Sequence, residues 1–350
     1  MSRLICLVIG ALSIFGSTRW NSVHGELSVS DPKSPRAHCT HTNGAVTACA
    51  ILITRNEWPL LRSWVMHHGD LLGFENIHII DDSDDVLAVE YLRRSSSKYG
   101  ISVDFTKAGM LQLEDKMTEV ALDMRSRCDF IFKLDTDEFL GVHNGDGHPA
   151  QVDQPSFRAA LSVLSSNAEK FKIPFSQLAG RQMTCGDPAL ATTFDGIRTD
   201  GPPKHFYNSK LLTKIDLGTH RGGTTTSSVI HTSRFLIMHF QLKCHEVYVR
   251  NLKEALISQQ VLPGNATDSE HLAALVKIKN KFTKGCGMSN CHKASAYYQY
   301  LLNPEEVRRQ HSDQAPAGVL STGLQDRPVG VLFTGLRDRM QKLMLKYADF

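Results

Sequence analysis

The stretch that decides the fold is VTACAILI at Val46–Ile53, which the polar residues TRNE at Thr54–Glu57 follow directly. A short, continuous apolar run of this kind is typical of a strand that is buried on both faces of a parallel sheet. Pro59 stands where the first turn of a helix tolerates proline, and the apolar residues of 60–68 recur at helical spacing. The sequence therefore predicts a strand that leads through a polar turn into a helix.

The same alternation continues downstream. Strands are predicted at 76–80, 101–105 and 130–134, and helices at 86–98 and 111–125. Alternating strands and helices predict a right-handed, parallel α/β unit of the Rossmann kind. The Gly-x-Gly-x-x-Gly fingerprint of dinucleotide-binding folds does not follow the first strand, so neither a nicotinamide nor a flavin cofactor is expected.

The composition is that of an ordinary folded protein. The chain has 350 residues, of which 41% are hydrophobic and 21% charged, and its formal net charge is +3. These values exclude a wholly disordered chain and a polytopic membrane protein. A nucleic-acid partner is not expected, because binding to nucleic acid needs a strongly basic face.

Polar clusters follow three of the predicted strands, at 54–57, 81–85 and 135–138. In open α/β sheets, ligands bind beyond the carboxyl ends of the strands, so the three clusters are expected to share one crevice. The last two clusters contribute seven carboxylates: Asp81, Asp82, Asp84, Asp85, Asp135, Asp137 and Glu138. Because crowded carboxylates repel one another, a bound cation is expected there.

Asp135-Thr136-Asp137 is the most informative triplet. Two carboxylates one residue apart at a strand end can both turn toward one divalent ion. Mg²⁺ or Mn²⁺ held in this way keeps open positions for diphosphate oxygens. Imidazole is a suitable third ligand for Mn²⁺, and His239, with His220 as the alternative, is the candidate.

Five segments together resemble the family 92 glycosyltransferases and the related family 2-like group. They are TRNE at 54–57, LRSWVMHH at 61–68, LGFENIHIIDD at 72–82, LDTDEFL at 134–140 and, more loosely, HFQLK at 239–243. The resemblance implies a GT-A-like, Rossmann-type nucleotide-binding sheet with a mixed α/β acceptor half. It also implies transfer of a hexose from a nucleotide-diphosphate sugar, such as a UDP-hexose, to a glycan or glycoconjugate, with inversion at the anomeric carbon.

The resemblance also implies roles for single residues. Arg55, Asn56 and Glu57 would lie by the nucleotide, and Asp82 near the base or ribose. Asp135 would contact the nucleotide sugar and would form the metal-binding pair with Asp137. The catalytic base does not carry over. By charge and position the candidates are Asp187, Asp195 and Asp216, each of which also reads as an ordinary surface carboxylate.

Two other functions stay open. A haloacid-dehalogenase-like phosphatase also places Asp-x-Asp after an apolar strand, with the first Asp as the nucleophile, but it prefers Thr or Val where this chain has Phe139. The second alternative is a catalytically inactive, luminal sugar-binding relative that retains the fold.

The chain divides into four parts by pattern. Residues 1–25 have the basic start, short apolar run and small residues of a signal peptide or short signal anchor. Residues 26–45 read as a linker or stem, and residues 46–310 as the glycosyltransferase domain, with a nucleotide-sugar half at 46–140 and an acceptor half at 141–310. The tail at 311–350 is predicted to end in a helix.

The cysteines and one sequon agree with a secretory address, in the Golgi lumen or membrane or, alternatively, outside the cell. Cys286 and Cys291 bracket the turn-like sequence GMSN and are predicted to form a disulfide. Asn265, in Asn-Ala-Thr, is the predicted N-glycosylation acceptor.

Removal of residues 1–25 should leave a soluble, folded domain, whereas the full-length chain should enter the secretory pathway and carry a glycan on Asn265. Expression in a secretory cell line, followed by fractionation and endoglycosidase treatment, checks both expectations. A full-length chain that stays cytosolic and unglycosylated would contradict this interpretation.

Overall fold

The computed structural model describes residues 46–348, except 107–109, 146–147, 165–167, 174, 180–186, 188, 190–196, 199–203, 217, 220–222, 225–229, 241–243, 259–260, 284–290 and 306–330. Residues 45–350 form one compact unit. The predicted signal segment and linker, as well as Asp195, His220 and Cys286, lie outside the described residues. Within the described part, no helix has the length and apolar character that crossing a membrane requires.

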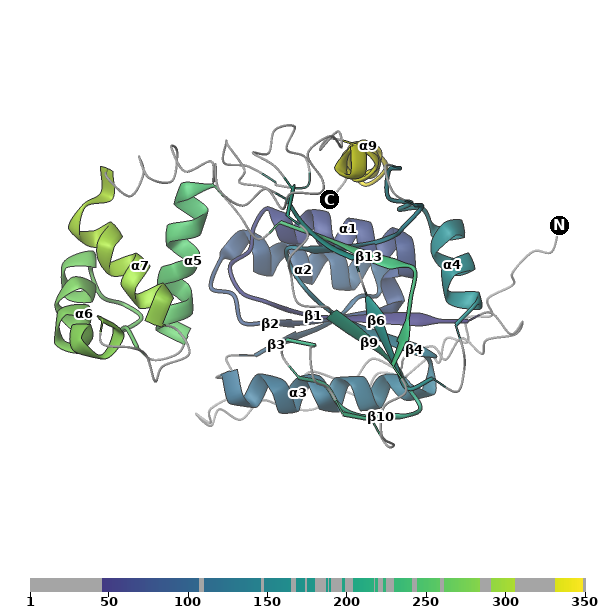
Figure 1. Cartoon of the computed structure of the whole chain (residues 1–350), viewed down its shortest axis with the longest axis horizontal. Coiled ribbons are helices and arrows are strands. Elements are labelled where there is room, and N and C mark those ends of the chain that lie inside the picture. The colour runs from purple at the N-terminus through teal and green to yellow at the C-terminus, as the bar shows by residue number, and fades with distance from the viewer. Residues whose placement is uncertain are drawn as a thin grey trace, which may run out of the picture. The chain divides into compact units, whose positions relative to one another are not determined.

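The main sheet has seven strands in the order β12-β6-β9-β4-β1-β2-β3. Their bounds are β1 Ala48–Thr54, β2 Ile77–Asp81, β3 Ser102–Phe105, β4 Phe130–Asp135, β6 Lys170–Ile173, β9 Lys204–Asn208 and β12 Ile230–Thr232. Strands β1 to β4 are parallel, as the sequence predicts, and β9 runs antiparallel between β4 and β6. The α/β class is therefore confirmed, with a mixed sheet (Figure 1).

Helices cover both faces of this sheet (Figure 1). They are α1 Leu60–Leu72, α2 Val86–Tyr99, α3 Met110–Asp123 and α4 Gln154–Ser162, with short 3₁₀ turns at Phe74–Asn76 and Met124–Ser126. Alternate residues of β1 point to opposite faces. Ala50 and Leu52 pack in the core under α1 and α2, whereas Cys49 and Ile51 pack in the core under α3. This explains why the first strand is apolar throughout.

A second sheet of four strands has the order β5-β13-β7-β8, and a separate two-stranded sheet joins β10 to β11. The bounds are β5 Glu138–Val142, β7 Phe175–Ala179, β8 Ile197–Arg198, β10 Leu212–Lys214, β11 Gly223–Thr224 and β13 Phe235–His239. Strand β5 begins directly after the Asp135–Asp137 turn and pairs with β13, in a register that sets Glu138 opposite His239. The sequence pattern did not predict β5.

Two buried histidines of α1 form hydrogen bonds with the backbone amide and carbonyl of Leu140 in β5. His67 Nε2 donates to the Leu140 carbonyl at 2.7 Å, and the Leu140 amide donates to His68 Nε2 at 3.2 Å. His68 Nδ1 in turn donates to the Trp64 carbonyl at 2.9 Å. Because its Nε2 accepts a hydrogen bond, His68 must be neutral. The two imidazoles thus replace the strand that would otherwise pair with β5.

Three helices form a unit with its own apolar core: α5 His245–Ser258, α6 Asp268–Thr283 and α7 Cys291–Leu302. A capping box starts α6, since the Thr267 amide donates to Glu270 Oε2 at 2.7 Å and the Glu270 amide donates to Thr267 Oγ1 at 3.3 Å. Asn265 lies exposed in the turn before this helix.

The predicted C-terminal helix is present as α9, Val331–Lys346. Its Leu336, Met340 and Leu343 join the core that includes α1. Asp70 of α1 accepts from Lys346 at 2.6 Å and Tyr347 at 3.2 Å, and also pairs with Arg339. The final helix is therefore packed on the domain through both apolar and charged contacts.

A disulfide joins Cys49 of β1 to Cys128, just before β4, across 79 residues of sequence. Closing a loop of this length in the unfolded chain corresponds to about 4.5 kcal/mol of stability in the chain-entropy model. The sequence analysis did not predict this pair. Cys244 is also disulfide-bonded. The predicted Cys286–Cys291 bridge stays a prediction, because Cys286 lies outside the described residues.

Acid should destabilise the fold through the α1 histidines. Burial lowers the pKa of His67 to about 3, with Arg339 adding to the effect, and burial also lowers the pKa of His68. Between pH 6.5 and pH 3 the unfolded chain therefore binds more protons, and the free energy of unfolding falls as the pH falls. Asp187 opposes this trend, because burial raises its pKa to about 6.

We expect the free energy of unfolding to depend less steeply on pH when His67 is replaced by a residue that does not titrate. Urea unfolding of the wild type and of His67→Gln, measured from pH 7.5 to pH 4.5, should give a wild-type slope steeper by up to ~1.4 kcal/mol per pH unit. Gln can keep the hydrogen bond to the Leu140 carbonyl but does not titrate. Parallel slopes would show that His67 does not contribute to acid sensitivity.

Candidate functional site

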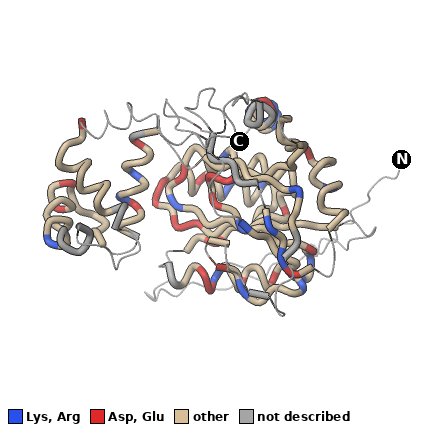
Figure 2. Tube along the Cα trace, viewed as in Figure 1, with Lys and Arg blue, Asp and Glu red and all other residues tan. Residues whose placement is uncertain are grey.

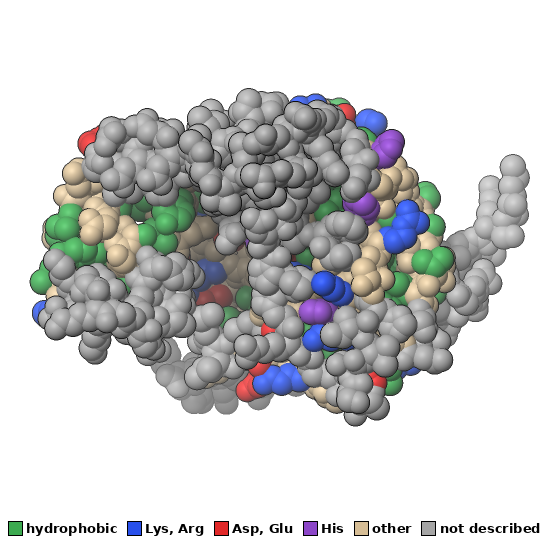
Figure 3. Space-filling model, in the orientation of Figure 1, with side chains coloured by type: hydrophobic (Ala, Val, Ile, Leu, Met, Phe, Trp, Pro, Cys, Tyr) green, Lys and Arg blue, Asp and Glu red, His purple; other side chains and the backbone are tan. Residues whose placement is uncertain are grey.

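The ends of the parallel strands meet at one edge, as the sequence predicts. In the sheet register, Thr54 lies beside Asp81 and Ile53 lies beside Asp135. A cavity of about 440 Å³ opens at this edge. It is lined by Ile53, Thr54, Arg55, Glu57, Asp135, Thr136, Asp137, His239, Asn251, Glu254 and Ala255. On the face shown in Figure 3, acidic and basic side chains lie together at the base of a hollow.

Asp137 and His239 are brought together by the pairing of β5 with β13. The Phe240 amide donates to the Asp137 carbonyl at 2.7 Å, and His239 Nε2 lies 3.3 Å from Asp137 Oδ1. Burial alone would lower the pKa of His239, but the hydrogen bond and charge of Asp137, with Glu138 adding to them, raise it. The pair is partly accessible, with side-chain exposures of 19% and 17%.

Asp135 is held by two lysines that the sequence analysis did not single out. Lys133 pairs with Asp135 Oδ1, and Lys204 Nζ lies 2.9 Å from Asp135 Oδ2. Burial would raise the pKa of Asp135, but the two ammonium groups outweigh it and hold the pKa below its usual range. The Asp135 carboxylate is therefore anionic and fixed in place at the cavity wall.

Glu138 is the fourth charged residue of this cluster and contacts both Lys204 and the backbone of Asp135. Its side chain is fully buried; Oε1 lies 2.7 Å from Lys204 Nζ, and Oε2 accepts from the Asp135 amide at 3.0 Å. Burial and the nearby Asp135 raise the pKa of Glu138 against the opposing effect of Lys204. Glu138 therefore shapes the Asp135–Asp137 turn instead of facing the cavity.

The expected carboxylate crowding has a different solution from the one that the sequence suggested. Five of the seven carboxylates, those of Asp82, Asp84, Asp135, Asp137 and Glu138, are paired with Arg55, Lys133, Lys204 or His239. Figure 2 shows basic and acidic positions together in this part of the trace. Repulsion by itself therefore does not require a bound cation, and the metal ion expected from the sequence stays a prediction.

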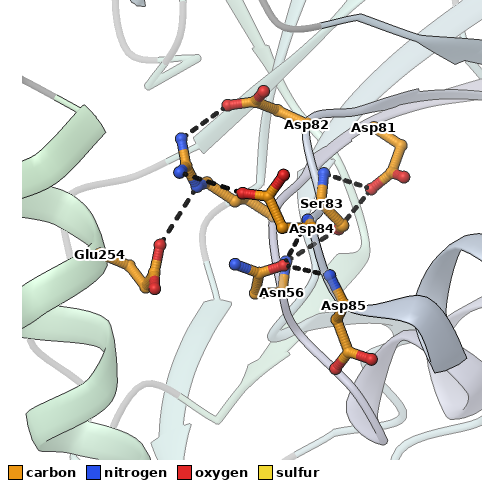
Figure 4. Close-up of polar contacts among 8 residues, drawn as sticks. Asn56, Asp81, Asp82, Ser83, Asp84, Asp85 and Glu254 are labelled. Carbon is orange, nitrogen blue, oxygen red and sulfur yellow. Dashed lines mark hydrogen bonds and ion pairs between the residues drawn. The ribbon is translucent and has the colours of Figure 1, made fainter. Parts of the chain in front are cut away.

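Arg55 forms ion pairs with Asp82 and Asp84 after β2 and with Glu254 on α5, and Figure 4 shows these three partners. Its Nη1 lies 2.8 Å from Asp82 Oδ2, and its Nη2 lies 3.7 Å from Asp84 Oδ2. Its Nε lies 3.3 Å from Glu254 Oε2 on helix α5. Asp82 is thus the partner of Arg55, and the two side chains that the sequence placed near the nucleotide lie side by side.

Asn56 holds the loop between β2 and α2. It adopts a positive φ of 53°, a conformation that Asn tolerates better than most residues. Its Oδ1 accepts from the amides of Asp84 and Asp85 at 2.8 and 2.9 Å, and its own amide donates to Ser83 Oγ at 2.8 Å (Figure 4). Because the carboxamide oxygen is used within the loop, Asn56 positions the neighbouring acidic residues. Glu57 lines the cavity.

Asp137 and His239 fit as two neighbouring ligands of a divalent ion. With metal–oxygen distances of about 2.1 Å, adjacent ligands of an octahedral ion stand about 3 Å apart. This agrees with the 3.3 Å between Asp137 Oδ1 and His239 Nε2. Among the residues described, no three His, Cys, Asp or Glu side chains form a metal-type group. A metal here would therefore need ligand atoms from the substrate, as Mg²⁺ at phosphate sites usually has.

The structure places two of the three candidate bases, and neither lines the cavity described above. Asp187 hydrogen-bonds to Ser63 in the first turn of α1, and burial raises its pKa to about 6. Asp216 lies 3.5 Å from the Tyr207 hydroxyl, and Tyr207 pairs with Ile131 near the start of β4, toward the opposite end of that strand from Asp135. Asp195 is outside the described residues.

One sequence signal could have revealed the lysine cluster. Lys133 interrupts the apolar strand FIFKLD, and a lysine inside a buried strand requires an anionic partner. Lys204 and Glu254 gave no comparable signal, since they come from distant segments that only the fold brings to the cavity.

Comparisons with known proteins give distant structural similarities. No protein-family model matches the sequence, and no curated protein matches it either. S. aureus TarS 1-349 in complex with UDP-GlcNAc is 10% identical, with 87% of this chain and 92% of that chain covered and a TM-score of 0.36. The mannosyltransferase PcManGT from Pyrobaculum calidifontis, in complex with GDP-Man and Mn2+, is 10% identical, with 86% of each chain covered and a TM-score of 0.29.

A cytidylyltransferase from Leptospira borgpetersenii is 13% identical, with 47% of this chain and 61% of that chain covered and a TM-score of 0.25. These similarities are distant, and the α/β class of the chain rests on its own sheet topology. Likeness of this degree does not establish an activity, so the function proposed below rests on the site.

Replacement of Lys204 should be costly because it leaves the buried Glu138 without its cation. Lys204→Met is expected to lower the free energy of unfolding by about 3 kcal/mol, the cost of breaking a buried ion pair. The double variant Lys204→Met/Glu138→Gln should recover much of this loss, because no uncompensated buried charge remains. Chemical denaturation of the three proteins measures both effects, and a Lys204→Met protein as stable as the wild type would refute the ion-pair argument.

Proposed function

We propose that this protein is a metal-dependent glycosyltransferase of the GT-A type, related to the family 92 and family 2-like enzymes. It would move a hexose from a nucleotide-diphosphate sugar to a glycan or glycoconjugate, with inversion at the anomeric carbon. One observation carries the proposal. At the carboxyl edge of a Rossmann-type sheet, a single cavity is lined by Arg55, Asp135, Asp137 and His239.

These side chains suit a nucleoside-diphosphate leaving group. Asp137 and His239 would hold Mn²⁺ or Mg²⁺, which when bound supplies positive charge for the departing diphosphate. Arg55 presents a guanidinium, whose planar donors match phosphate oxygens. Asp135 stays anionic, so it can accept hydrogen bonds from ribose or sugar hydroxyl groups.

The proposal also includes the donor substrate and the cellular location. A UDP-hexose is the proposed donor, and the Golgi lumen or membrane is the proposed location, with secretion as the alternative. The buried Cys49–Cys128 disulfide supports an oxidising compartment, since disulfides are rare in the cytosol. The exposed position of Asn265 is compatible with a glycan at that site.

Asp137→Asn tests the proposed function. The change keeps the size of the side chain but removes one anionic ligand, so metal-dependent transfer or hydrolysis of the nucleotide sugar should fall by about 100-fold or more. Wild type and variant would be assayed with a panel of nucleotide sugars across a manganese titration. Circular dichroism would confirm that the variant is folded.

Asp338→Asn is a matched control, because it makes the same chemical change on the exposed face of α9. Its activity should equal that of the wild type. Wild-type activity that is indifferent to chelator, or a folded Asp137→Asn enzyme with full activity, would falsify the metal-dependent reading. Release of phosphate from simple monoesters would favour the phosphatase, and silence in every assay would favour the sugar-binding relative.

A further inference from the structure

One wall of the cavity belongs to a helical unit with a separate core. Asn251, Glu254 and Ala255 of α5 line the cavity opposite the strand ends. Helix α5 packs with α6 and α7 around Leu252, Leu256 and Tyr297, in a cluster distinct from the two cores of the main sheet. Because the cores are separate, α5 can shift relative to the sheet without opening an apolar core to water.

The Arg55–Glu254 ion pair joins this wall to the sheet. Glu254 Oε2 lies 3.3 Å from Arg55 Nε, and Figure 4 shows the Glu254 carboxylate extending from its helix toward the loops that hold Asp82 and Asp84. The side chains of Arg55 and Glu254 are 26% and 27% exposed, whereas Arg55 Nε itself is buried and makes no hydrogen bond among the described residues, so the contact with Glu254 is an ion pair without a hydrogen bond and contributes little to stability. A contact of this kind can open without unfolding either partner.

The guanidinium is shared among three carboxylates. Asp82 holds Nη1 at 2.8 Å from the sheet side, and its side chain is only 12% exposed. Asp84 stands farther away at 3.7 Å, with a side chain that is 68% exposed. Glu254, on helix α5, lies next to Nε of the same guanidinium. A phosphate that enters the cavity therefore meets an arginine whose positive charge is already compensated.

We propose that the Arg55–Glu254 ion pair is a latch that keeps helix α5 over the cavity, and that the diphosphate of the donor opens it by replacing Glu254 on Arg55. The latch rests on the proposed function for its ligand. Asp82 keeps the arginine in place, while Glu254 supplies the exchangeable anion. Glu254 thereby sets how strongly a nucleoside diphosphate binds and couples donor binding to movement of α5.

The latch predicts that removing the competing charge strengthens binding. Glu254→Gln should lower the Kd for UDP by about two- to fivefold, as expected for loss of one solvent-accessible ion pair. Isothermal titration calorimetry at low ionic strength and saturating Mg²⁺ measures the change. In an Arg55→Gln background the same substitution should have no effect, because a double-mutant cycle isolates the coupling between the two side chains.

Glu119→Gln is the matched control for net charge, since Glu119 lies on α3 with a side chain that is 73% exposed. It should bind UDP like the wild type. Unchanged or weaker binding by Glu254→Gln, or an equal gain in the Arg55→Gln background, overturns the latch.

Hydrogen exchange of the ligand-free protein separates failure of the latch from failure of the proposed function. Amides of 245–258 should exchange faster in Glu254→Gln than in the wild type, and addition of UDP should speed the wild-type exchange in the same segment. If no variant binds UDP, the proposed function fails, and the ligand-free exchange alone decides the latch. Equal exchange in both proteins then refutes it.

Discussion

The hydrogen bonds between helix α1 and the Leu140 peptide are the contacts on which the site depends. Strand β5 lies at the edge of its sheet, and its outer amide and carbonyl at Leu140 are buried groups that need partners. His67 and His68 supply both partners, and His68 can accept from the Leu140 amide only as a neutral imidazole. Since β5 starts directly after the Asp135–Asp137 turn, these bonds also fix the position of Asp137 relative to His239.

At the strand ends, acidic side chains are paired with basic side chains of the same protein. Lys133 and Lys204 approach Asp135 from two different strands, and Glu138 lies below them without exposure to solvent. Buried charges persist when an opposite charge pairs with them, as Lys204 pairs with the buried Glu138. The result is a cavity whose charges are balanced inside the protein. Asp137 and His239 line the cavity together and are the residues that would hold a cation under the proposed function.

Two further restraints hold the sheet and its helices together. The Cys49–Cys128 disulfide ties the starts of β1 and β4, which are neighbours in the main sheet. On α1, Asp70 accepts hydrogen bonds from Lys346 and Tyr347 and forms an ion pair with Arg339, all in the C-terminal segment. Helix α1 is thereby fixed on one side by α9 and on the other by β5. Among the described residues, the apolar core of α5–α7 is separate from the two cores of the main sheet, and the Arg55–Glu254 ion pair is one contact that joins the unit to the sheet.

The sequence by itself determined the parallel α/β half of the molecule. Apolar runs such as Val46–Ile53 are buried on both faces, and each stops at a polar cluster, so the order of strands and helices, and the shared edge of the clusters, could be read from local pattern. Asp137 and His239 were both chosen from the sequence as candidate metal ligands, but their contact requires the β5–β13 pairing that the pattern did not show.

Only the tertiary structure decided which charges pair with which. Lys204 lies 69 residues from Asp135, and Glu254 lies about two hundred residues from Arg55, so no local spacing connects them. The Cys49–Cys128 bridge was hidden for the same reason. Periodicity reports which face of an element is buried, because burial acts on each residue separately. Ion pairs, disulfides and hydrogen bonds at a strand edge depend on pairs of residues, and the fold alone brings those pairs together.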